Sequence, residues 1–163
     1  MTQNESAVYL VLETLNIPYE RFEHQEARTM LDCEMIDENI NAAHCKNLFL
    51  CNRQGTQPYL LLVVGDKAFR TKDVSAQLGV ARLSFGTAAQ LNAVLGLTPG
   101  SVSPMGLIND LHKRTHVLVD RELSEWEKIV VHPNVNTASI ILSTADLKRF
   151  LEYCGNEITY VDI

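Results

Sequence analysis

The sequence predicts an α+β fold: one domain with a curved mixed β-sheet flanked by helices. The first observation is the order of elements, in which hairpins and helices are mixed and neither a β–α repeat nor an all-β pattern is followed. The second is that the chain of 163 residues contains no internal repeat or linker, so a single domain over 1–163 is expected. A hydrophobic content of 46% lets a chain of this length bury a core without disulfides.

Helices are predicted where apolar residues recur at helical spacing between residues that cap helix ends. One amphipathic stripe has apolar residues at i, i+3, i+4 and i+7, namely Val8, Val11, Leu12 and Leu15. Several later segments begin at Ser or Thr and are followed by Gly. The predicted helices cover residues 4–15, 30–35, 71–78, 87–95 and 144–153.

Strands are predicted from short apolar runs. The runs 47–51 and 59–64 flank a short loop with Gly55, which predicts a hairpin. The second run lacks alternation, so it is expected to be a central strand covered on both faces. Shorter strands or extended pieces are expected at 19–22, 82–85, 117–119, 128–131, 138–142 and 158–161, and a structured loop at 97–105.

Charge and composition narrow the function classes. A net charge of −6 argues against broad binding to DNA or another polyanion. No apolar run approaches the ~20 residues that span a bilayer, and the N-terminus does not resemble a signal peptide, so a cytosolic protein without a membrane partner is expected. The four cysteines lack paired spacing, and no Walker loop, GxGxxG or HExxH motif is present. Neither a metal nor a cofactor is expected.

The segment 44–50 places a lysine at the head of an apolar strand. Lys46 can project from there into a cleft at the end of the sheet, or it can be a solvated cation at a strand end. The neighbouring Cys45 could be an activated thiol, although a catalytic cysteine also needs a base and an orienting group.

Two loops add groups that bind polar ligands. In 97–106, prolines set the path while Gly100 permits a close backbone approach or a positive φ, so the loop can present N–H groups to a carbonyl or phosphate oxygen. In 131–138, a histidine, two asparagines and a threonine suit a polar uncharged ligand. Either loop could instead be a tight connection without a ligand.

Basic residues gather in one stretch despite the acidic total. A small nucleic-acid footprint or merely solvated faces would both explain this pattern. The stretch contains Lys67, Arg70, Lys72 and Arg82, and a second pair is Lys113 and Arg114.

Read together, these segments resemble the YbaK and prolyl-tRNA synthetase insertion-domain superfamily, most closely its free-standing ProX/PrdX-like branch. The resemblance extends over most of the chain and rests on the segments 46–50, 82–86, 97–104 and 132–138, with Thr29-Met30 near the start. It implies an α/β fold with a curved mixed sheet. It also implies hydrolysis of mischarged proline tRNA in trans, with alanine as the usual amino acid and cysteine in a sister branch.

The resemblance also implies roles for individual residues. Lys46 would be the family's essential lysine, and His132 would be the pocket histidine. Met30 would line the amino-acid pocket, so Met30→Ala is expected to admit larger amino acids. The loop of the site would contain Gly100, Ser101, Ser103 and Pro104; substrate contacts are expected from Asn47, Asn136 and Thr137, and tRNA contacts from Arg82, Lys67 and Arg70.

The expected chemistry needs no protein nucleophile, because an aminoacyl ester already hydrolyses readily. Water would attack the ester carbonyl, loop N–H groups would stabilise the oxyanion, and Lys46 would hold the tRNA terminus. The tRNA's 2′-hydroxyl would help to activate the water. Other hypotheses remain: a cysteinyl-tRNA deacylase, a non-catalytic module that binds tRNA or prolyl-tRNA synthetase, and a small-molecule hydrolase using Cys45 or Cys51.

Overall fold

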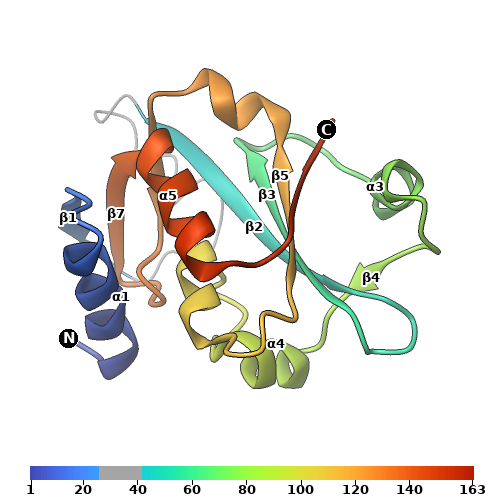
Figure 1. Ribbon diagram of the computed structural model, residues 1–163, viewed down its shortest axis with the longest axis horizontal. Coiled ribbons are helices and arrows are strands. Elements are labelled where there is room, and N and C mark those ends of the chain that lie inside the picture. The colour runs from blue at the N-terminus through green and yellow to red at the C-terminus, as the bar shows by residue number, and fades with distance from the viewer. Residues whose placement is uncertain (26–41) are drawn as a thin grey trace.

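The protein is organised around one mixed sheet (Figure 1). The computed structural model describes residues 1–25 and 42–163. Within these ranges the sheet has eight strands: seven follow the order β1-β7-β6-β2-β3-β5-β8, and β4 pairs with β2 beside this path. Three neighbouring pairs are parallel, β2–β6, β3–β5 and β5–β8, while the other pairs are antiparallel. The predicted class, a mixed sheet flanked by helices, is confirmed.

The elements follow the chain in a mixed order. The strands are β1 (Glu20–Glu23), β2 (Ala43–Cys51), β3 (Pro58–Val64), β4 (Ser84–Phe85), β5 (His116–Asp120), β6 (Lys128–Val131), β7 (Ala138–Ser143) and β8 (Ile158–Val161). The α-helices are α1 (Gln3–Thr14), α3 (Thr71–Leu78), α4 (Ala88–Leu95) and α5 (Thr144–Cys154), and the 3-10 helices are η1 (Pro104–Asn109) and η2 (Arg121–Glu125).

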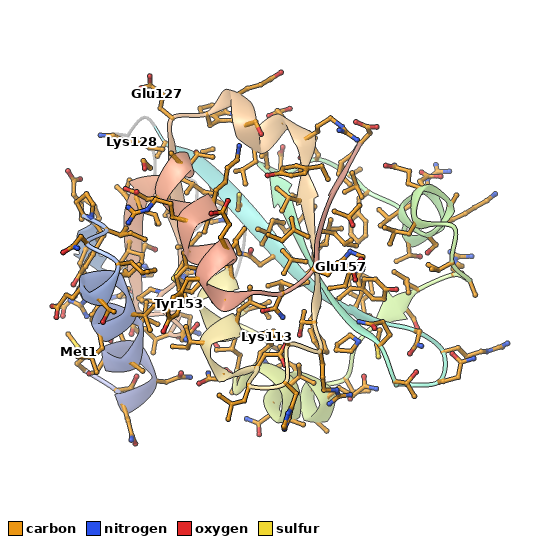
Figure 2. All side chains as sticks on the ribbon, in the orientation of Figure 1. Met1, Lys113, Glu127, Lys128, Tyr153 and Glu157 are labelled. Atoms are coloured by element: carbon orange, nitrogen blue, oxygen red, sulfur yellow. The ribbon has the colours of Figure 1, made fainter. Side chains whose placement is uncertain are left out.

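The sheet separates two apolar layers of unequal size. The larger core packs one face of the sheet against α1, α4, α5 and η1, through residues such as Leu12, Leu95 and Phe150. The smaller core lies on the other face, where Val74 of α3 packs with Leu61 of β3. Side chains fill the space between helices and sheet (Figure 2). Burial of these apolar surfaces is the main stabilising contribution to the fold.

Most predicted elements are confirmed within one to three residues. The hairpin forms β2 and β3, and β3 is buried along its whole length between β2 and β5, as its lack of alternation predicted. Thr87 caps α4 in a capping box with Gln90. Helix α3 differs at its start, because its N-cap is Arg70 and no side chain bonds there. The short helix predicted at 30–35 lies outside the described residues.

One edge of β2 changes partner along its length. Its first residues pair with β6, at Ala43–Ile129 and His44–Val130, and its last two pair with β4. Between them, residues 46–48 of this edge have no ladder partner among the described strands, while the other edge stays paired with β3. Strands that diverge in this way leave a gap in the sheet where side chains from neighbouring strands can surround a ligand.

Candidate active site

Lys46 lies at this gap in the sheet. It was expected to head its strand, which is wrong, since β2 begins at Ala43 and Lys46 is its fourth residue. The Lys46 Nζ donates a hydrogen bond to the Lys67 carbonyl oxygen at 3.0 Å and lies 5.9 Å from the ring centroid of Phe69. No carboxylate in the described ranges forms an ion pair with it. Its positive charge is therefore available to an anionic ligand.

Asn47 faces the other side of the sheet. Alternation along β2 puts it on the face of Cys45 and Phe49, which belong to the larger core. Its Nδ2 donates to the Cys45 carbonyl oxygen at 3.3 Å, whereas its Oδ1 is buried and accepts no hydrogen bond. A buried carbonyl oxygen without a donor is unfavourable, so this atom is suited to accept a hydrogen bond from a bound molecule.

His132 lies across the gap from Lys46. The two residues stand at matching positions, each two residues beyond the last β2–β6 pair, His44–Val130. Both alternate with residues of the larger core, so both are on the opposite face of the sheet. The His132 Nδ1 lies 3.2 Å from the Ala138 carbonyl oxygen, which makes Nδ1 the protonated nitrogen of the neutral ring. The Nε2 can then accept a hydrogen bond from a ligand.

The loop that leads into η1 packs against the segment after His132. The Ser103 hydroxyl donates to the His132 carbonyl oxygen at 2.5 Å and accepts from the Met105 N–H in the first turn of η1. Ser101 closes a tight turn, because its N–H and its hydroxyl both bond to the Thr98 carbonyl oxygen. Both serine hydroxyls therefore have structural roles, and Pro104 contributes the first residue of η1.

Free N–H groups remain in this loop. In the part of the chain that the structure describes, the amides of Gly100, Val102 and Ser103 donate to no other group. A Cβ atom on Gly100 would lie 3.2 Å from the Asn136 Nδ2, and Gly100 does not need a positive φ. Of the two expected reasons for glycine here, close approach is the one that applies.

His24 is a neighbour that sequence reasoning missed. Its ring lies 6.2 Å from that of His132, edge to face, and its Nε2 is 2.9 Å from the Ser139 hydroxyl. Its backbone N–H donates to the Thr137 carbonyl oxygen, which joins β1 to the loop before β7. The positions of the histidines in the sequence did not predict this proximity, because β1 and β7 are far apart in the chain.

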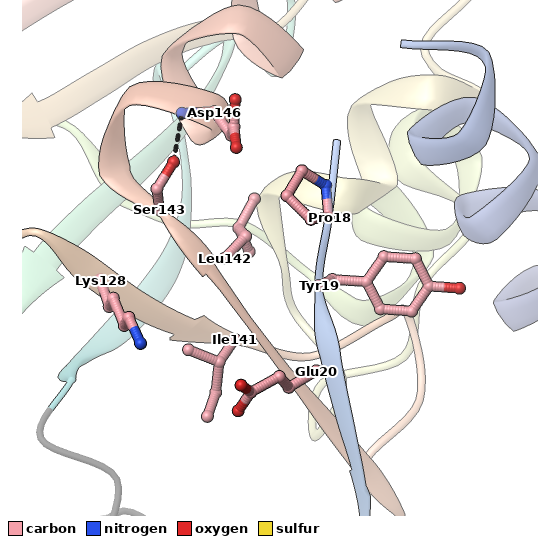
Figure 3. A pocket seen from close by; sticks show the side chains of 8 residues that line it. All are labelled: Pro18, Tyr19, Glu20, Lys128, Ile141, Leu142, Ser143 and Asp146. Carbon is pink, nitrogen blue, oxygen red and sulfur yellow. Dashed lines mark hydrogen bonds between the residues drawn. The ribbon is translucent and has the colours of Figure 1, made fainter. Parts of the chain in front are cut away.

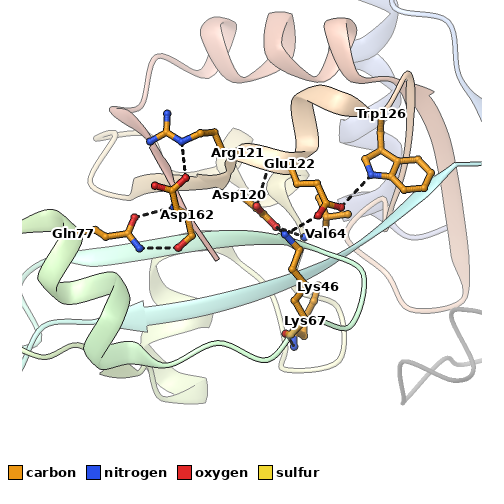
Figure 4. Close-up of polar contacts among 9 residues, drawn as sticks. All are labelled: Lys46, Val64, Lys67, Gln77, Asp120, Arg121, Glu122, Trp126 and Asp162. Atoms are coloured by element: carbon orange, nitrogen blue, oxygen red, sulfur yellow. Dashed lines mark hydrogen bonds and ion pairs between the residues drawn. The ribbon is translucent and has the colours of Figure 1, made fainter.

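The basic residues expected at tRNA differ in their surroundings. Lys67 forms ion pairs with Asp120 at 2.8 Å and Glu122 at 3.0 Å (Figure 4). Burial acts to lower the pKa of Lys67, but the hydrogen bonds to both carboxylates outweigh it and raise the pKa. Arg82 is exposed and its Nε lies 3.4 Å from the Thr71 hydroxyl, and Arg70 is exposed as well. Lys67 is thus the least suited of the three to bind a phosphate.

Other sequence expectations have different outcomes. Met30 and Thr29 lie outside the described residues. Cys45 and Cys51 are buried in the protein, which disfavours a role for either as a nucleophile on a large substrate. Within 1–25 and 42–163, no three His, Cys, Asp or Glu side chains are arranged to hold a metal ion. None of the helices described is both long and apolar enough to cross a bilayer.

A separate hollow of about 230 Å³ lies beside β7 and the start of α5 (Figure 3). Its lining includes Pro18, Tyr19, Ile141 and Leu142. None of the described residues expected to act on substrate lines it, and most of its exposed lining is apolar. It is therefore not part of the candidate site.

Comparison with known proteins identifies the family of this chain. Residues 24–150 match the family model described as the aminoacyl-tRNA editing domain. The prolyl-tRNA editing protein ProX of Acetoanaerobium sticklandii is 34% identical over 160 residues, covering 98% of this chain and 97% of ProX. The prolyl-tRNA synthetase associated domain-containing protein 1 of Bos taurus is 30% identical over 149 residues, covering 90% and 87% of the two chains.

Solved structures share the fold. A crystal structure described as a candidate trans-editing enzyme for prolyl tRNA synthetase superposes with a TM-score of 0.75 at 16% identity, covering 100% of this chain and 99% of the other. A scaffold used for epitope grafting reaches 0.76 at 18% identity over 100% and 99%. The family model, the relatives and the predicted resemblance agree, and the chain belongs to the aminoacyl-tRNA editing family of deacylases.

Proposed function

We propose that this protein hydrolyses the ester of alanine mischarged on proline tRNA, acting in trans. The observation that carries the proposal is the gap beside β2, where two consecutive residues place an ammonium and a buried amide oxygen on opposite faces of the sheet. Among the described residues, the ammonium has no carboxylate partner and the amide oxygen has no donor. These groups belong to Lys46 and Asn47. One suits a phosphate or ribose of the tRNA end, and the other suits a hydrogen-bond donor of the substrate.

The reaction assigns each group a distinct task. Water attacks the ester carbonyl carbon, the carbonyl oxygen gains negative charge, and the bond to the ribose oxygen then breaks as that oxygen takes up a proton. Free amides in the loop from Gly100 to Ser103 stabilise the oxyanion, an effect worth about 3 kcal/mol for one donor. The Nε2 of His132 accepts a hydrogen bond from the substrate, and the tRNA's 2′-hydroxyl orients the water.

There is a physical reason why an editing enzyme is needed in addition to the synthetase. A synthetase pocket shaped for proline discriminates weakly against a smaller amino acid, since each missing methylene is worth only about 1–3 kcal/mol. A separate pocket that admits only a small side chain can hydrolyse the wrong ester and spare the right one. The proposed substrate is therefore the alanyl ester.

The decisive experiment is an ester-hydrolysis assay on proline tRNA charged with alanine, cysteine or proline. Alanyl ester is expected to disappear fastest, and prolyl ester at the uncatalysed rate. Lys46→Ala protein measures the background from the same preparation. Equal loss of all three esters, or no loss above background, would contradict the proposal.

Two other functions predict different results in that assay. A cysteinyl-tRNA deacylase would prefer the cysteinyl ester. A non-catalytic module that holds tRNA or prolyl-tRNA synthetase would bind uncharged tRNA but hydrolyse none of the esters. Partnership with the synthetase, a single domain over 1–163 and a cytosolic location stay predictions.

A further inference from the structure

A second hollow lies on the far side of the gap from His132. It has a volume of about 610 Å³ and is lined by the tip of the β2–β3 hairpin, the start of α3 and the segment 81–85. Two arginines, Arg53 and Arg82, line it, and none of the described residues in its lining is acidic. In a protein with a net charge of −6, this local positive charge favours an anionic ligand.

Phe85 forms an aromatic wall of this hollow. Its side chain is 61% exposed, an unusual exposure for a phenylalanine held in a strand. The strand is fixed in place, because Phe85 pairs with Leu50 and the Gly86 N–H donates to the Phe49 carbonyl oxygen at 2.9 Å. A Cβ on Gly86 would lie 2.3 Å from the Phe49 ring, so only glycine permits this close approach.

A continuous path joins the hollow to the candidate active site. The Phe85 ring lies 6.1 Å from the Phe69 ring, edge to face, and the Lys46 Nζ lies 5.9 Å from that same Phe69 ring. The path therefore has one cation at each end, Arg82 in the hollow and Lys46 at the gap, with two aromatic rings between them. Proteins that bind single-stranded nucleic acid combine positive charge with exposed rings in this way.

We propose that this hollow is a nucleotide subsite for the unpaired 3′ end of tRNA. One base stacks on Phe85, while Arg82 and Arg53 pair with the phosphates on either side of it. The strand then runs over Phe69 and delivers its terminal ribose to Lys46. The inference rests on the proposed function for the identity of the nucleic acid. It assigns roles to Phe85 and Arg53, for which the family resemblance implied none.

The test measures binding of uncharged proline tRNA, either intact or trimmed of its unpaired 3′ nucleotides. Wild-type protein is expected to bind the intact form more tightly. Phe85→Ala and Phe85→Leu are expected to weaken binding of the intact form about 5- to 150-fold and to leave the trimmed form unchanged. Phe85→Trp keeps a ring and is expected to bind as the wild type does.

Matched controls come from exposed residues elsewhere. Tyr153, 53% exposed on α5 (Figure 2), supplies an aromatic control, and Tyr153→Ala is expected to bind both tRNAs normally. Arg53→Ala is expected to weaken binding of intact tRNA and to lower its salt slope by about 0.7, the value for one phosphate of a single strand. The exposed Arg114, replaced in Arg114→Ala, is expected to change neither quantity.

The outcomes separate this inference from the proposed function. Wild-type affinity in Phe85→Ala and Phe85→Leu, an equal loss on both tRNAs, or no binding by the wild type overturns the subsite. Hydrolysis of alanyl ester together with any of these results leaves the proposed function standing. Preference for the intact 3′ end that depends on Phe85, without hydrolysis of any ester, supports the subsite and contradicts the proposed function.

Discussion

Lys46 and Lys67 are joined by one hydrogen bond, from the Lys46 side chain to the Lys67 backbone, but their ammonium groups have opposite electrostatic surroundings (Figure 4). The Lys46 Nζ donates to the Lys67 carbonyl oxygen and, among the described residues, pairs with no carboxylate. The Lys67 Nζ pairs with Asp120, whose side chain is 2% exposed, and with Glu122. The Asp120 carboxylate also accepts from the Val64 N–H.

This difference predicts different roles for the two lysines. Lys67 balances a buried negative charge, so removing it mainly affects folding. Lys46 has a positive charge that no carboxylate of the described residues neutralises, which supports the proposal that it binds a ligand. A residue type alone does not distinguish these cases, because the carboxylates that decide them come from β5 and η2, more than fifty positions along the chain.

The largest expected effect is on catalysis by Lys46→Ala. Deacylation of alanyl proline tRNA is expected to fall about 100-fold or more, since a preorganised charge at the reacting group is lost. Unfolding free energy should change by only about 1 kcal/mol, the value of one hydrogen bond. Initial rates and urea unfolding measure the two quantities. Wild-type turnover by the folded variant would remove Lys46 from the mechanism.

The second expected effect is on stability in Lys67→Met. The variant leaves the buried Asp120 carboxylate without its cation and is expected to lose about 3 kcal/mol of unfolding free energy. Lys72→Met, at an exposed position of α3, is the matched control and should lose less than about 0.5 kcal/mol. Equal stability of both variants would show that the ion pair does not hold this part of the fold.

A smaller effect concerns the salt dependence of tRNA binding. Arg82→Ala is expected to reduce the slope of log affinity against log salt by about 0.7 to 0.9, the change for one phosphate contact. Lys67→Met should leave the slope unchanged, because Asp120 and Glu122 already neutralise this ammonium. Titrations at several salt concentrations test both variants. A reduced slope in Lys67→Met would mean that a phosphate displaces its carboxylates.

The smallest effect is on stability at alkaline pH. Because folding raises the pKa of Lys67 above its ordinary value, its contribution is complete below that value and is lost as pH rises through the folded pKa. Above about pH 10.5, the unfolding free energy of the wild type should therefore fall more than that of Lys67→Met. Urea unfolding of both proteins on either side of this pH measures the difference. If the unfolding free energies of the two proteins changed in parallel with pH, the raised pKa of Lys67 would not contribute to stability.

Local patterns were enough to predict most elements, as α4 and β3 illustrate. The Thr87 cap, the apolar stripe and Gly96 define α4 through contacts within four residues. The unbroken apolar run of β3 predicted a central strand because only burial on both faces tolerates it. Lys46 and His132 were identified by resemblance. Their shared face and matching register were not predictable, since they depend on a parallel pairing across some ninety residues.

By itself, the sequence determined the fold class and the family and indicated the residue types of the candidate site, because periodicity, caps and motifs depend on neighbouring positions. Tertiary structure alone decided which cations are neutralised, where β2 separates from β6, and that the rings of Phe69 and Phe85 lie beside each other near Lys46. The reason is physical: electrostatic pairing and strand divergence depend on groups brought together only when distant segments pack.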